Sequence, residues 1–265
     1  MFKTYATVIP AHNEEENLPS ILEALQSQTL KPTQIIVVND GSTDNTGDIA
    51  RNFGCTVVDL PFHEKNWRGL PQLAGVINAG LRHVGEENEY VMILGADHKL
   101  PPKYAETIIS RMNKNLSLVI ASGMIKEDKM RRNGPPRGSG RVVRLSFWRP
   151  LGLHYPENYG WESWLNFKAL QLSRQIKKFD DIESNVLRPT AKTYIYGKGM
   201  RSLGYWTPYA IGRCIRLFPK NPKAAFRVFW DWISARNIEE LDIAAWVREH
   251  QKKIFRTKLR KVMRL

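Results

Sequence analysis

Residues 35–46 read IIVVNDGSTDNT, and this stretch decides the fold class. Four branched apolar residues come first, in the continuous run that is typical of a strand buried on both faces of a parallel sheet. A polar turn at Asp40 follows, and Ser42 or Thr43 is suited to cap a helix that ends near Phe53. The stretch therefore predicts a strand, a polar turn and a helix, which together make one repeat of an α/β fold.

The same alternation of strands and helices extends along the first hundred residues. Apolar strands are predicted over residues 6–9, 56–58 and 90–94. Apolar residues at helical spacing predict amphipathic helices over 18–25 and 70–84. Strands separated by helices require crossover connections, so we expect a parallel sheet with helices on both faces.

The pattern of predicted elements changes after Asp97. We expect, in order, a helix over residues 101–113, a strand over 118–121, a long loop over 126–144, a helix with one apolar face over 161–172, and basic, aromatic helices from Tyr194 onward. The loop is predicted from its many Gly, Pro, Arg and Lys residues. No sharp linker interrupts the chain, which favours one body with two functional halves.

Polar residues follow three of the predicted strands. They occupy residues 10–15, Asn39 with Asp40, and residues 95–98. In an open α/β sheet, ligands bind outside the carboxyl ends of the strands, so we expect one site there. Carboxylates can meet the polar edge of a nucleobase, and they can hold a hard cation that neutralises a diphosphate.

Five motifs, in this order along the chain, resemble those of the family-two glycosyltransferases. They are VIPAHNEE (8–15), VVNDGSTDNT (37–46), NAG (78–80), ILGADHKLP (93–101) and YGWESW (159–164). The resemblance covers roughly the first two-thirds of the chain. It implies a GT-A-type, Rossmann-like, mainly parallel sheet flanked by helices, to which the composition adds a helical, basic C-terminal extension.

The resemblance also implies roles for particular positions. Contacts with a nucleotide sugar are implied for Pro10, Ala11, Glu14 (or Glu15), Asp40, Arg68, Asp97, Lys198 and Arg201. Asp97 matches the carboxylate that binds Mg²⁺ or Mn²⁺, and Glu162 is the best candidate for the catalytic base. Lys198 and Arg201 lie in a glycine-containing segment, GKGMR, which could equally be a flexible helix start on the surface.

Three positions depart from the family pattern. Gly95 replaces the first Asp of the Asp-x-Asp motif. Many relatives manage with one carboxylate, and His98 or another group could compensate here. Ser163 occupies the usual position of the base. Val186 stands where relatives often carry a His, two residues before Arg188. The nucleotide-binding prediction is unaffected, whereas the catalytic assignment rests on Glu162.

We therefore expect transfer of a sugar from a UDP- or GDP-sugar to an acceptor hydroxyl, with inversion and with metal assistance. Residues 1–100 would bind the nucleotide sugar, residues 101–205 would bind the acceptor, and residues 206–265 would form the basic extension. A degenerate nucleotide-sugar-binding protein of the same fold is the alternative. A nucleotidyltransferase is disfavoured, because residues 10–14 are acidic where those enzymes carry a glycine-rich, basic loop.

The net charge of +14 favours an anionic partner, which could be a nucleic acid, a membrane surface or a phosphorylated substrate. No recognised motif supports nucleic acid binding. Residues 246–264 are basic and amphipathic, so this helix either docks on the protein or lies on an anionic membrane. The two cysteines are far apart, and we find neither a signal peptide nor a spanning segment. These features predict a cytoplasmic protein that is at most peripheral to the membrane. We expect its acceptor to be a glycan or a lipid-linked molecule.

Overall fold

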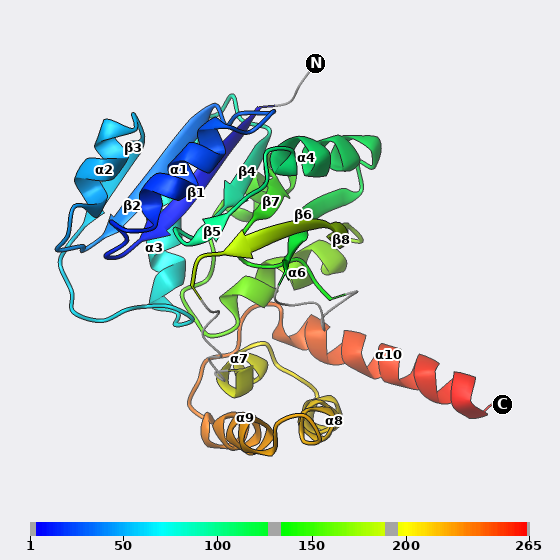
Figure 1. Ribbon diagram of the computed structural model, residues 1–265. Helices are drawn as coiled ribbons and strands as arrows, with labels where there is room; N and C mark the ends of the chain where they lie inside the picture. The colour runs from blue at the N-terminus through cyan, green and yellow to red at the C-terminus, as the bar shows by residue number, and fades with distance from the viewer. Residues whose placement is uncertain (1–3, 127–133, 189–195, 264–265) are drawn as a thin grey trace.

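The computed structural model describes residues 4–126, 134–188 and 196–263. These residues form a sheet in the order β3-β2-β1-β4-β7-β6-β8-β5 (Figure 1). The strands are β1 (Tyr5–Ala11), β2 (Gln34–Asp40), β3 (Thr56–Leu60), β4 (Tyr90–Ile93), β5 (His98–Lys99), β6 (Leu118–Ile125), β7 (Arg141–Arg144) and β8 (Gln175–Val186). The predicted α/β class is confirmed.

The first four strands are all parallel. β1 lies between β2 and β4, so the strand order reverses beside β1, and this reversal is where open α/β sheets bind ligands. The predicted strands of the first hundred residues are therefore present, and their carboxyl ends share one edge.

The second half of the sheet is mixed, which refines the prediction of a mainly parallel sheet. β7 runs antiparallel to both β4 and β6, and β8 runs parallel to β6. All of β7 is buried, so the prediction of one loop over residues 126–144 is wrong for its last four residues. Residues 127–133 of that predicted loop lie outside the described residues.

Helices cover both faces of the sheet, and each face has its own core. One core joins α1 (Leu18–Gln26), α2 (Thr46–Asn52) and α4 (Tyr104–Lys114) to strand residues such as Ile9 and Val37. The other joins α3 (Gln72–Leu81) and α6 (Trp161–Gln171) to the alternate strand residues, Val8 and Val38 among them. Because successive side chains of a strand point to opposite faces, the continuous apolar runs supply both cores.

Five further helices are described in the chain. They are α5 (Leu145–Trp148), α7 (Tyr196–Ser202), α8 (Thr207–Leu217), α9 (Pro222–Ser234) and α10 (Ala244–Met263), with a 3₁₀ turn at Arg149–Leu151. Figure 1 shows α7, α8 and α9 grouped below the sheet and α10 projecting beyond it. Leu172 is 50% exposed just past α6, so its predicted place on the buried face of that helix is wrong. Among the described helices, none is long and apolar enough to cross a membrane.

Candidate functional site

The loops that follow β1 and β2 are hydrogen-bonded to each other. The bonds are Asn13 N–H to Ser42 Oγ (3.0 Å), Thr43 N–H to Asn13 Oδ1 (2.8 Å), Glu14 N–H to Thr46 Oγ1 (2.7 Å), Glu15 N–H to Asp44 Oδ2 (3.0 Å) and Asn45 N–H to Glu15 Oε2 (3.1 Å). Residues about thirty positions apart in the chain thus form one hydrogen-bonded polar surface at the carboxyl ends of the two strands. We call this surface, formed by residues 13–15 and 42–46, the ledge.

The predicted cap of the second helix needs correction. α2 begins at Thr46, and the Asp44 carboxylate accepts from its N–H at 3.0 Å. Ser42 and Thr43 face Asn13 instead, whose backbone has a φ of 54°. Asn tolerates this left-handed conformation better than most residues do, because its short polar side chain bonds locally.

Asp40 ends β2 and is buried, with two histidines around it. Its carboxylate Oδ1 lies 2.9 Å from His63 Nε2, and its main-chain oxygen lies 2.5 Å from His12 Nδ1. The indole N–H of Trp67 also reaches His63 Nε2 at 2.9 Å. A ring nitrogen either donates or accepts, so His63 bonds to Asp40 in one tautomer and to Trp67 in the other.

Potential ligand atoms of His12, Asp40 and His63 all lie within 4.8 Å of one another. His63 Nε2 already contacts the Asp40 carboxylate and Trp67, His12 Nδ1 contacts the Asp40 main-chain oxygen, and the two imidazole rings stack with their centroids 5.0 Å apart. The cluster is therefore explained by the hydrogen bonds that hold Asp40. Neither histidine was predicted to take part in the site.

Asp97 follows β4, and two guanidinium groups face its carboxylate. Arg68 NH2 and Arg188 Nε each lie 3.4 Å from Asp97 Oδ2. Arg188 also forms an ion pair with Glu14, which is buried at the end of the first loop. Asp97 and Glu14, 83 positions apart, are thus held beside the same arginine, and the predicted neighbour Arg68 is present as well.

A side chain at Gly95, where the family pattern would place a carboxylate, would be crowded by two neighbouring side chains. A Cβ at this position would lie 3.1 Å from Asp97 Oδ1 and 3.2 Å from Ser139 Oγ. The Gly95 N–H donates to the same Ser139 hydroxyl at 2.8 Å. Ser139 therefore lies directly beside Gly95, and it comes from a segment that the sequence did not connect to this site.

His98 does not compensate for the missing carboxylate. It is 1% exposed, and its two ring nitrogens lie 2.7 Å from the hydroxyls of Ser139 and Ser184. Burial lowers the pKa of His98 to about 4, although the Asp97 carboxylate opposes this shift, so the ring is neutral at pH 7. With both nitrogens hydrogen-bonded, His98 positions the loop and offers no lone pair to a metal.

Glu162 lies in the first turn of α6 with its side chain 50% exposed. The buried Arg141 of β7 donates to the Glu162 main-chain oxygen at 3.0 Å, and its guanidinium lies 3.5 Å from the Glu162 carboxylate. A Cβ on Gly138 would lie 2.7 Å from that carboxylate. Because Ser139 follows Gly138, the segment before β7 links the surroundings of Glu162 and Asp97.

Lys198 and Arg201 lie on α7, which packs against the start of α6. A Cβ on Gly160, the residue before α6, would come within 3.0 Å of the Gly199 main-chain oxygen. The Lys198 ammonium lies over the ring of Tyr159, 5.2 Å from its centroid. The glycines of this segment thus serve helix packing, and they place the two cations on the Glu162 side of the site.

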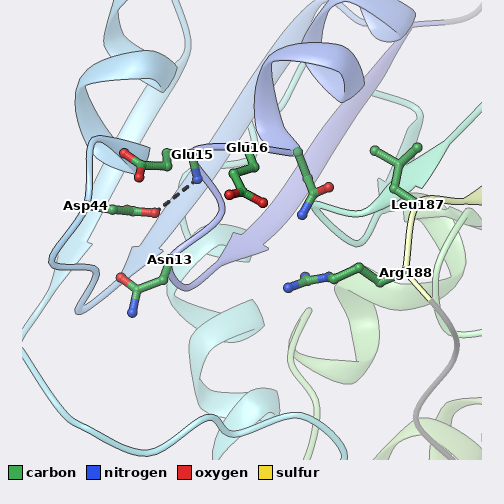
Figure 2. Close-up of a pocket in the computed structure, with 7 residues that line it drawn as sticks. Asn13, Glu15, Glu16, Asp44, Leu187 and Arg188 are labelled. Atoms are coloured by element: carbon green, nitrogen blue, oxygen red, sulfur yellow. Dashed lines mark hydrogen bonds between the residues drawn. The ribbon is translucent and has the colours of Figure 1, made fainter.

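A hollow of about 530 Å³ adjoins the first loop (Figure 2). It is lined by Asn13, Glu15, Glu16, Asn17, Asp44, Leu187 and Arg188. Figure 2 shows the Arg188 side chain reaching toward the hollow from the end of β8. Neither Asp40 nor Asp97 lines this hollow.

The structure thus brings Pro10, Ala11, Glu14, Asp40, Arg68 and Asp97 to one edge of the sheet, with Glu162, Lys198 and Arg201 on the adjoining helices. The sequence did not predict the parts played by His63, Ser139, Arg141 and Arg188. A polar residue at the carboxyl end of a strand was a usable signal for Arg188, which follows β8 closely.

Comparisons with known proteins agree with this geometry. The family model described as glycosyl transferase family 2 matches residues 7–192. The 4,4'-diaponeurosporenoate glycosyltransferase of Staphylococcus aureus is 45% identical over 58 residues, which are 22% of this chain and 15% of that protein. The match thus covers a small part of this curated relative.

Two solved structures are similar in fold. The mannosyltransferase PcManGT from Pyrobaculum calidifontis, in complex with GDP-Man and Mn²⁺, has a TM-score of 0.62 and 16% identity, over 93% of this chain and 79% of that one. S. aureus TarS 1-349 in complex with UDP-GlcNAc has a TM-score of 0.57 and 14% identity, over 75% of this chain and 64% of that one. At such identities the likeness is one of fold.

Proposed function

The chain belongs to glycosyl transferase family 2, and from this premise we propose that it transfers a sugar from a UDP- or GDP-sugar to an acceptor hydroxyl. One observation carries the proposal. The loops after β1, β2 and β4 meet at the point where the strand order reverses, and Asp97 lies there between two arginines. That arrangement suits a nucleoside diphosphate, whose base and phosphates need different partners.

The base and ribose would lie along the ends of β1 and β2, beside Pro10, Ala11 and Glu14. Asp40 is suited to read the base, because a buried carboxylate accepts N–H groups such as those of uracil or guanine. A base that donates to Asp40 would replace the bond from His63, which can then accept from Trp67. The histidine would thus keep a hydrogen bond in both states.

The diphosphate would lie near Asp97, Arg68 and Arg188. Mg²⁺ accepts one or two carboxylates with the remaining ligands from phosphates and water, so Asp97 fits a cation that the sugar donor helps to hold. When bound, Mg²⁺ or Mn²⁺ would supply positive charge to the leaving diphosphate. The two guanidinium groups lie 3.4 Å from Asp97 in this structure. They would supply further positive charge to the diphosphate once they turn from Asp97 to the phosphates.

Glu162 would deprotonate the acceptor hydroxyl, and the hydroxyl oxygen would attack the anomeric carbon as the bond to the diphosphate breaks. A single displacement of this kind inverts the anomeric centre. The half-exposed Glu162 carboxylate is accessible to an acceptor, and the Arg141 guanidinium lies 3.5 Å from it. Lys198 and Arg201 would lie on this side, facing the phosphates or the acceptor.

The acceptor would be a glycan or a lipid-linked molecule, and the protein would work in the cytoplasm with peripheral contact to the membrane. The alternative is a degenerate protein that binds a nucleotide sugar without turning it over. Gly95 and Ser163 are the positions that favour this alternative. Detectable release of nucleoside diphosphate from any sugar nucleotide would exclude it.

Thermal-shift measurements with a panel of nucleoside diphosphates, with and without Mn²⁺, test the proposal. A ligand that binds only the folded state stabilises it by about 2.7 kcal/mol at 100 times its Kd. We expect a Mn²⁺-dependent rise in Tm with UDP or GDP that Asp97→Ala abolishes. Asp59→Ala, which removes an exposed carboxylate from β3, should keep the shift.

Each outcome of this screen has a definite meaning. A shift that survives in Asp97→Ala would contradict the placement of the diphosphate and the metal. No shift with any nucleotide would mean that the fold is preserved without the nucleotide site, and the proposal would fail.

A further inference from the structure

Helices α8 and α9 each expose a row of large apolar side chains. The exposed residues are Ile211 and Ile215 on α8 with Phe218 at its C-cap, and Phe226, Trp230 and Ile233 on α9. Their spacing of three and four residues puts each row on one face of its helix. Phe226 and Trp230 are 67% and 60% exposed, which is unusual for aromatic side chains on a packed helix.

These rows are separate from the faces on which the helices pack. Ala210 and Cys214 of α8 and Val228 and Trp232 of α9 form a small core with Met200. The exposed rows are therefore a second apolar surface, and we call the six residues the α8–α9 surface. Figure 1 shows both helices outermost, in the lower part of the molecule and away from the sheet.

The charges around the α8–α9 surface are mostly positive. Residues 207–234 contain five cations and one acid, Asp231. The cations are Arg213, Arg216, Lys220, Lys223 and Arg227, and all of them are exposed. Within the described part of the chain, none of these five forms an ion pair with a carboxylate. Their charge is thus available to an anionic partner.

We propose that the α8–α9 surface docks on an anionic lipid membrane. Aromatic and aliphatic side chains enter the boundary between headgroups and acyl chains, while arginine and lysine bind the anionic headgroups. A second copy of this chain would bring like charges together, which opposes self-association. A nucleic acid would leave the two apolar rows without a partner.

This inference extends the peripheral membrane contact of the proposed function and assigns it to α8 and α9. α10 begins on the core through Ile243 and Val247, so the first part of the basic terminal helix is docked on the protein. Phe255 further along α10 packs on Trp206 with ring centroids 5.4 Å apart and remains 45% exposed, so it could add to the membrane contact.

Flotation with lipid vesicles tests the proposal on the full chain. Vesicles of phosphatidylcholine mixed with anionic phosphatidylglycerol should bind the protein, and vesicles of phosphatidylcholine alone should not. Phe226→Ser with Trp230→Ser should weaken binding about tenfold, because two aromatic anchors are lost. Lys220→Glu with Lys223→Glu should weaken it by a similar factor.

Matched control variants lie on the far side of the molecule. Leu116 is 70% exposed and Lys114 is exposed at the end of α4, so Leu116→Ser and Lys114→Glu remove the same kinds of side chain. Both should bind vesicles as the unaltered protein does. If these control variants lose vesicle binding equally, the binding depends on the overall charge of the protein, and the α8–α9 assignment is overturned.

Two further outcomes would overturn the inference. One is the absence of vesicle binding by the unaltered protein. The other is a dimer in gel filtration that Phe226→Ser with Trp230→Ser converts to a monomer without changing vesicle binding, because the surface would then belong to a second copy. The nucleotide-dependent thermal shift, measured on the same preparations, reports the proposed function separately, since it needs no membrane.

Discussion

The ledge after β1 and β2 and the start of α6 carry the two halves of the proposed site, and they are built differently. In the ledge, backbone N–H groups and side chains bond to one another across two loops. At α6, the Glu162 carboxylate is half exposed and 3.5 Å from its arginine, longer than a normal hydrogen bond. A preorganised ledge suits a ligand of fixed shape, whereas an accessible carboxylate suits proton transfer to a varied acceptor.

The largest expected effect is on the reaction rate, and it distinguishes the two halves of the site. Glu162→Gln keeps the shape of the side chain and removes its basicity, so we expect the release of nucleoside diphosphate from the sugar nucleotide to slow by about 10²- to 10³-fold. The thermal shift with the nucleotide should be unchanged, because the ledge is intact. Initial rates and thermal shifts on the same variant check both expectations.

Ser163→Ala is the matched control for Glu162→Gln, because it alters the next residue of the same helical turn. It should keep at least most of the rate. If Ser163→Ala abolished the rate while Glu162→Gln preserved it, the base would be assigned to the wrong residue and the contrast between the two halves would disappear.

A smaller effect is expected at Asp40 in the nucleotide-binding half. Asp40→Asn offers one acceptor fewer to the base and places an amide N–H against its donors, so nucleotide affinity should fall about tenfold. The turnover rate at saturation should change little. Titration calorimetry with the nucleotide identified by thermal shift measures this, and Asp59→Asn, at the exposed β3, should bind normally. Unchanged nucleotide affinity in Asp40→Asn would mean that the base binds elsewhere.

The sequence predicted the parallel half of the sheet because its strands are continuous apolar runs, such as residues 35–38. It missed β7 because that strand begins and ends with arginine. Both are buried, and their guanidinium groups donate to main-chain oxygens, Arg141 to that of Glu162 and Arg144 to that of Met112. A buried arginine satisfied by carbonyl groups has no local sequence signature.

Long-range contacts limited the prediction of the site. Arg188 lies 174 positions from its partner Glu14, and Ser139 lies 41 from His98, so neither contact follows from the spacing of motifs. The α8–α9 surface could not be predicted from the sequence for another reason. A helix with two apolar faces has the same composition as a buried helix, and only packing tells which face is covered.

The smallest effect concerns the ledge itself. Burial raises the pKa of Asp44, but the hydrogen bonds from Thr46 and Glu15 outweigh it and hold that pKa below its ordinary value of 3.8. A carboxyl group with a lowered pKa contributes stability that is present above the unfolded pKa and lost as the pH falls through the folded pKa. Asp44→Asn should therefore cost about 1 kcal/mol at pH 7, a figure kept small because solvent screens a partly exposed group. The difference between the two proteins in urea unfolding should shrink below pH 3.8. Asp48→Asn removes an exposed carboxylate from the first turn of α2 and should show neither effect. An equal loss there would mean that the ledge is no more stable than the surface around it.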